Sequence, residues 1–104
     1  MGKKKVFSEE DLAKDLMLPG PGQMVGRVEN FLGYDRIMVY CTDQKKRLCR
    51  IRGKLKRRVW IRAGDFVLVE PWSFEEGRGN ILWRYYRGQA KFLRKRDLIP
   101  DEWI

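Results

Sequence analysis

The sequence predicts an all-β fold with added helices, in which five strands close a small barrel. After residue 23, apolar and polar residues alternate with period two in several short runs, which is typical of half-buried strands. Glycine, proline and aspartate separate these runs. Two other segments, 53–61 and 89–98, carry apolar residues at helical spacing. A length of 104 residues permits one domain with a small core.

The expected strands follow one another with short turns between them. We expect them at residues 24–29, at 36–42, around Cys49 and Ile51, at 66–69 and at 80–86. Gly26 in the first strand would allow a bend or a close approach of backbones. Alternation also predicts which side chains point into the barrel: Ile37, Val39, Cys41, Cys49, Ile51, Val67, Ile81 and Trp83.

The chain divides into three regions. Residues 1–22 are expected to be a flexible arm, because Leu18-Pro19-Gly20-Pro21-Gly22 breaks regular structure. Residues 23–86 form the barrel, and residues 87–104 form a C-terminal helix and tail. The apolar residues of helix 89–98, among them Phe92, Leu93 and Leu98, are expected to cover the outward side chains Phe66, Leu68 and Leu82.

Positive charge is concentrated in one segment, Lys45 to Arg62, which we call the basic block. It holds ten cations in eighteen positions and no acidic residue: Lys45, Lys46, Arg47, Arg50, Arg52, Lys54, Lys56, Arg57, Arg58 and Arg62. Apolar residues interleave with these cations, so the segment belongs to a folded surface rather than to a disordered tail. The alternative is a solvated, charge-rich face. With a net charge of +9, the block predicts nucleic-acid binding.

The element order and the place of the cations favour one barrel family. Five strands with a short helix between the third and fourth are the order of the OB-fold, a Greek-key barrel. The spacing also fits an SH3-like barrel. Strands two and three of an OB-fold form its usual nucleic-acid face, and Arg50 and Arg52 are expected to point outward there, beside Met38 and Tyr40.

Two aromatic side chains are candidates for stacking on RNA bases. Tyr40 occupies an outward position on the second strand, and Trp60 follows the helix-like turn. Trp60 could instead plug the bottom of the barrel, and Tyr40 could be structural. Trp72 and Trp103 fit either a partner contact or local packing.

Several classes of chemistry are disfavoured by composition. The chain has no histidine and only Cys41 and Cys49, so the usual zinc sets cannot form and we expect no metal or other cofactor. The two thiols are expected to be buried and free, with a disulfide as the alternative. Paired carboxylates occur only in loop or terminal segments, which argues against an enzyme such as a nuclease. Without an apolar leader or membrane-length run, the expected location is the cytoplasm.

The sequence resembles archaeal and eukaryotic translation initiation factor 1A. The resemblance covers roughly residues 20 to 100 and depends on Gly22-Gln23, the stretch from Arg47 through Ile61, Gly64-Asp65, Val69-Glu70-Pro71-Trp72 and Asn80-Ile81-Leu82-Trp83-Arg84-Tyr85. A more distant likeness runs to bacterial initiation factor 1. The chain lacks the long acidic C-terminal tail of the eukaryotic form, so an archaeal-type factor is indicated.

The resemblance implies a non-enzymatic factor with an OB-fold. Such a factor binds rRNA of the small ribosomal subunit near the aminoacyl (A) site, helps recruit the initiator tRNA and works with other translation initiation factors. By motif, Lys54, Lys56, Arg57, Arg58 and Trp60 match the rRNA-contacting loop and helix, and Lys46, Arg47, Arg50 and Arg52 match the basic strand face. We expect a monomer. The alternative is a general single-strand RNA-binding protein or RNA chaperone.

Overall fold

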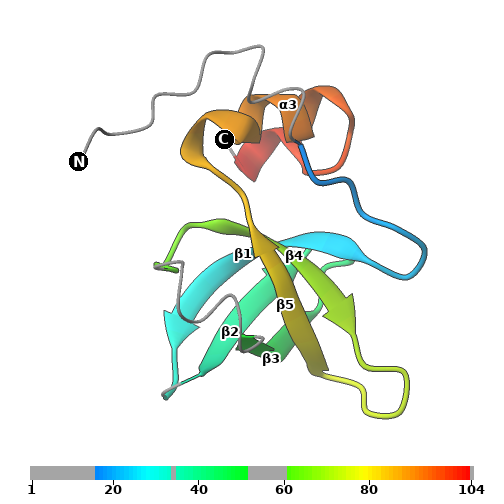
Figure 1. Ribbon diagram of the computed structural model, residues 1–104, viewed down its shortest axis with the longest axis vertical. Helices are drawn as coiled ribbons and strands as arrows, with labels where there is room; N and C mark the ends of the chain where they lie inside the picture. Colours follow the sequence, from blue (N-terminus) through cyan, green and yellow to red (C-terminus); the bar gives the residue numbers. More distant parts are fainter. Residues whose placement is uncertain (1–15, 34, 52–60, 104) are drawn as a thin grey trace, which may run out of the picture.

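The computed structural model describes residues 16–33, 35–51 and 61–103 and shows a β-barrel with a short helix at one end (Figure 1). The strands are β1 (Met24–Phe31), β2 (Arg36–Cys41), β3 (Lys46–Ile51), β4 (Phe66–Pro71) and β5 (Arg78–Arg84). They are followed by η1 (Arg87–Gln89), α3 (Ala90–Lys95) and η2 (Asp101–Trp103), of which η1 and η2 are 3-10 turns.

The strands close in the order β1-β2-β3-β5-β4, with β4 returning to β1. The β3 and β5 strands pair in parallel, and every other neighbouring pair is antiparallel. This closed, OB-like arrangement confirms the five-stranded barrel. The helix expected at 53–61 between β3 and β4 falls almost entirely outside the described residues, and Ile61, its last residue, is buried in the core.

The barrel interior is filled by aliphatic side chains and two thiols. Ile37, Val39 and Cys41 of β2 are fully buried, as alternation along this strand predicts. Cys41 and Cys49 are free and buried, which confirms the expected state of both thiols. Burial raises the pKa of the Cys49 thiol to about 12, so it stays protonated and unreactive at neutral pH. The core cluster consists of Val28, Ile37, Val39, Cys41, Cys49, Ile61, Val67, Val69 and Ile81.

Gly26 marks the point where β1 passes closest to its neighbours. A Cβ atom there would collide with Val39 Cγ1 and lie 3.2 Å from Val69 Cγ2. The position therefore requires glycine for packing, in agreement with the predicted close approach.

The prediction that Trp83 points into the barrel is wrong. Ile81 stands opposite Val69 and Trp83 stands opposite Leu68, so β5 uses two residues where β4 uses one. This β-bulge breaks the alternation and turns Trp83 outward, where it packs against an outer cluster. The buried members of this cluster are Val25, Leu68, Tyr85, Leu93 and Ile99.

The C-terminal segment covers that outer cluster, as expected, but its helix is shorter than 89–98. Leu93 is fully buried and Leu98 packs beside it, which confirms two of the three predicted contacts. Phe92 is not part of the cluster and lies beneath the ammonium groups of Lys91 and Lys95. The helix ends because Asp97 adopts a φ of 58°, and the Leu98 N–H then donates to the Leu93 carbonyl at 2.9 Å.

The described end of the predicted arm contacts the rest of the fold. The Tyr85 hydroxyl donates to the Met17 carbonyl at 2.5 Å, and Leu16 packs against the outer cluster. Residues 1–15 lie outside the described residues, so the division into arm, barrel and C-terminal segment stays a prediction. In the described part of the chain, no helix is both long and apolar enough to cross a membrane.

Candidate nucleic-acid interface

The structure describes half of the residues predicted to bind RNA. Tyr40, Lys45, Lys46, Arg47, Arg50 and Arg62 are described. The other predicted residues lie outside the described residues: Arg52, Lys54, Lys56, Arg57, Arg58 and Trp60. The described part of the basic block is therefore its two ends, residues 45–51 and 61–62.

Two lysines lie at the start of the block, beside the β2–β3 turn. Lys45 Nζ is 3.3 Å from Glu76 Oε1, and Lys46 Nζ is 3.4 Å from Glu29 Oε1. Both lysine side chains remain about 60% exposed (58% and 62%). Exposed ion pairs of this kind contribute at most about 1 kcal/mol. Each ammonium group can therefore exchange its carboxylate for a phosphate at little cost.

Arg47 does not lie on the outward, basic face of β3, where it was predicted to lie. Its side chain is only 8% exposed and donates two hydrogen bonds to Asp43, at 2.9 Å to Oδ1 and 2.7 Å to Oδ2. Arg47 stands opposite Val39, whose side chain points into the barrel, so strand alternation turns the guanidinium inward. The hydrogen bonds from Arg47 hold the pKa of the Asp43 carboxyl below its ordinary value of 3.8. Arg47 is thus a structural cation in this fold.

Arg50 lies on the outward face of β3, but its neighbour across the ladder differs from the one expected. It stands opposite Arg36 of β2, whereas Met38 faces Leu48 and Tyr40 faces Lys46. Both arginines are exposed, and Asp35 lies 3.4 Å from the Arg50 guanidinium. Like charges directly opposite one another destabilise a sheet, and the Asp35 carboxylate offsets part of this repulsion.

Arg36 is a cation that the sequence reasoning missed. It precedes the basic block by nine positions in the chain and joins it only through strand pairing. The signal was available in the alternation of β2, which places Arg36 on the same face as Met38 and Tyr40.

Tyr40 is half-buried beneath the C-terminal turn. Its ring centroid lies 6.0 Å from that of Trp103, which also stacks on Phe66 at 5.9 Å with an interplanar angle of 17°. Arg27 stands between Phe66 and Tyr40 in the cross-strand row, and its Cζ lies 5.7 Å from the centre of the Trp103 ring. Trp103 therefore packs against this row of side chains. It contacts part of the Tyr40 ring, which was predicted to stack on an RNA base.

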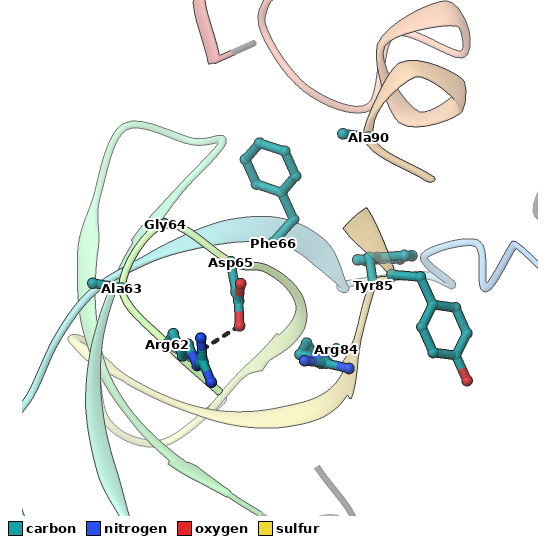
Figure 2. Close-up of a pocket in the computed structure, with 9 residues that line it drawn as sticks. Arg62, Ala63, Gly64, Asp65, Phe66, Arg84, Tyr85 and Ala90 are labelled. Atoms are coloured by element: carbon teal, nitrogen blue, oxygen red, sulfur yellow. Dashed lines mark hydrogen bonds between the residues drawn. The ribbon is translucent and has the colours of Figure 1, made fainter. Parts of the chain in front are cut away.

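Arg62, the last cation of the block, borders a hollow between the barrel and α3. The hollow has a volume of about 550 Å³, and Arg84 of β5 also lines it. Figure 2 shows the Arg62 and Arg84 side chains on the side of the hollow away from Ala90. The Arg62 backbone N–H donates to Asp65 Oδ2 at 2.8 Å, which fixes the turn that carries it. Arg84 is a second cation that the sequence reasoning missed.

The described surface carries exposed cations, three of which form exposed ion pairs with carboxylates. Exposed Lys and Arg side chains lie along β2, β3 and their turn, where they can contact phosphates without a change of backbone. Among the residues described, no group of three or more cysteine, aspartate or glutamate side chains could hold a metal ion.

Comparison with known proteins gives consistent matches along the chain. A family model described as translation initiation factor 1A / IF-1 matches residues 13–104. The chain is 45% identical to translation initiation factor 1A of Methanopyrus kandleri over 97% of this chain and 88% of that relative. It is 43% identical to translation initiation factor 1A of Pyrococcus abyssi over 100% of this chain and 93% of that relative.

A solved structure also shares the fold. The solution structure of translation initiation factor 1 from the Wolbachia endosymbiont of Brugia malayi matches with a TM-score of 0.51 and 26% identity. The match covers 68% of this chain and 84% of that one.

Proposed function

The chain belongs to the translation initiation factor 1A family, and on that premise we propose that it binds rRNA of the small ribosomal subunit near the A site. In this role it promotes recruitment of the initiator tRNA. The observation that supports the proposal best is the row of exposed cations on β2 and β3, from which the basic block continues into residues 52–62.

Phosphate contacts supply most of the proposed affinity. Three cations form only weak, exposed ion pairs with carboxylates: Lys45, Lys46 and Arg50. Each contact between one of these cations and an rRNA phosphate releases condensed counterions. Arg52, Lys54, Lys56, Arg57, Arg58 and Arg62 extend this surface along the sequence. Arg47 is left out of the contact set because its guanidinium is buried against Asp43.

Aromatic stacking adds a second, less salt-sensitive term. One base stacked on an aromatic ring is worth about 1 to 3 kcal/mol. We assign this role to Trp60 and to the part of Tyr40 that Trp103 leaves uncovered. Cations outnumber stacking rings, which favours folded, phosphate-dense RNA over a flexible single strand.

The proposed role needs no catalysis and no cofactor. The paired carboxylates Glu75 and Glu76 each lie 3.3 Å from a cation, Arg78 and Lys45 respectively, on an exposed loop. That arrangement does not resemble a general base or a metal site. The protein is proposed to act as a cytoplasmic monomer together with other initiation factors.

A competition experiment separates this proposal from a general RNA chaperone. We expect the protein to bind purified archaeal small ribosomal subunits at least about tenfold more tightly than an unstructured RNA oligonucleotide, a difference of about 1.4 kcal/mol. Fluorescence anisotropy of labelled protein at fixed salt measures both affinities. Equal affinity for the two RNAs would support the chaperone and contradict the proposal.

A further inference from the structure

The β4–β5 loop carries an exposed aromatic ring, Phe74, stacked on the half-buried ring of Trp72. Phe74 is 80% exposed, and its ring stacks on Trp72 with centroids 5.2 Å apart and planes inclined by 22°. The loop lies at the end of the barrel away from α3, where β4 leads into β5 (Figure 1). An exposed aromatic ring that rests on a second ring offers a flat apolar surface to a partner.

A groove of about 550 Å³ runs beside these rings, and its walls are held by hydrogen bonds. Pro21 and Gly22 form one wall, and Gln23 fixes their turn because its Oε1 accepts from the Gly20 N–H at 2.8 Å. Gln23 Nε2 in turn donates to Glu70 Oε2 at 3.3 Å. The Trp72 N–H donates to the Arg78 carbonyl at 3.0 Å, which positions the aromatic wall. The groove is thus fixed before any partner binds.

The β4–β5 loop beside this groove carries more carboxylates than cations. Between residues 70 and 78 the chain has Glu70, which lines the groove, Glu75 and Glu76, against one cation, Arg78, and Lys45 of the β2–β3 turn pairs with Glu76. Glu75 and Glu76 are about half to four-fifths exposed (49% and 83%), so each can accept a second cation. Carboxylates at this density repel RNA phosphates and attract Lys and Arg side chains.

We propose that this groove, with the Trp72–Phe74 pair, binds a Lys- and Arg-rich polypeptide segment of a small-subunit protein. Proteins that contact rRNA carry such segments. An arginine or lysine of the segment would lie over the exposed face of Phe74, within the roughly 6 Å at which a cation interacts with an aromatic ring. Neighbouring cations would pair with Glu75 and Glu76. The proposal rests on the proposed function, because that function brings the protein to the small subunit.

Neutralising the loop carboxylates tests the proposal, because the two kinds of partner predict opposite changes in the affinity for the small subunit. The double variant Glu75→Gln/Glu76→Gln is compared in a Lys45→Ala background, because Glu76 also pairs with Lys45, which the proposed function places on rRNA. In this background the double variant makes the protein more positive, so contact of the loop with RNA would tighten binding. Contact with a basic polypeptide instead predicts an affinity for purified small subunits that is about three- to tenfold weaker, from the loss of two partly exposed ion pairs. The matched control is Asp97→Asn/Glu102→Gln, which makes the same charge change on exposed residues of the C-terminal segment and should not weaken binding.

Photo-crosslinking identifies the class of partner directly. With p-benzoylphenylalanine in place of Phe74, irradiation of the complex with small subunits should link the chain to a ribosomal protein. Crosslinks to rRNA alone, no crosslinks, or tighter binding of the double variant would each overturn the proposal. Failure of the unmodified protein to bind the subunit would overturn the proposed function and this inference together. Normal subunit binding with no effect of the double variant would overturn the inference alone.

Discussion

Replacing Asp43 by alanine is expected to lower the free energy of unfolding by about 3 kcal/mol, because it leaves the buried guanidinium of Arg47 without its partner. Arg47 is only 8% exposed, so water can replace only part of the two hydrogen bonds that it donates to the more exposed Asp43 carboxylate. Urea denaturation followed by circular dichroism measures the loss.

Two further variants separate this effect from a general loss of charge. Glu76→Ala removes the carboxylate from an exposed pair with Lys45, and it should cost no more than about 1 kcal/mol. Adding Arg47→Met to Asp43→Ala removes the unpaired charge and should restore much of the lost stability. Equal losses for Asp43→Ala and Glu76→Ala would show that the Arg47 guanidinium does not depend on Asp43 as its burial requires.

The same pair predicts how stability depends on acid. The pKa of Asp43 is lower in the folded protein than its ordinary value of 3.8. Its contribution to stability is therefore complete above pH 3.8 and is lost as the pH falls through the folded value. The Asp43→Ala variant should lack this part of the acid dependence, which denaturation at about pH 3 and about pH 6 would reveal.

Replacing Arg57 and Arg58 together by alanine is expected to weaken binding to the small subunit and to flatten its salt dependence. Each lost phosphate contact reduces the slope of log K against log salt concentration by about 0.9 for duplex nucleic acid, so the double variant should lose about two units of slope. Equilibrium binding to purified subunits over a salt series gives the slope.

The matched control for this experiment is Arg94→Ala/Arg96→Ala. It removes the same charge from exposed positions at the end of α3, far from the basic block in sequence. Its slope should stay close to that of the unmodified protein. If both double variants flattened the slope equally, the effect would come from net charge, and the assignment of Arg57 and Arg58 would be wrong.

The β2 strand shows what the sequence was able to predict. Ile37, Val39 and Cys41 are buried because a half-buried strand in a barrel exposes alternate residues, and their pattern is uninterrupted. The same rule, extended from Cys49 back along β3, would have placed Arg47 inside the barrel. The prediction followed the charge of the basic block instead of the alternation, and it did not recognise Asp43, four residues earlier, as the ion-pair partner of the buried Arg47.

The β5 strand and the C-terminal turn show where such prediction fails. A β-bulge at Leu82 has no reliable sequence signature, yet it reverses the side on which Trp83 lies. Trp103 lies on Phe66 and Tyr40 because of tertiary packing between residues far apart in the chain, which no local pattern encodes. Arg36 likewise joins the basic block only through the pairing of β2 with β3, and Arg84 comes near Arg62 only because both line the hollow between the barrel and α3.

Chemical footprinting of small-subunit rRNA, with and without this protein, tests the central claim most directly. If the cationic surface fits one site, the protein should protect rRNA nucleotides from chemical modification only around the A site. This protection should disappear in the Arg57→Ala/Arg58→Ala variant. Weak protection spread over many helices of the rRNA would contradict the claim.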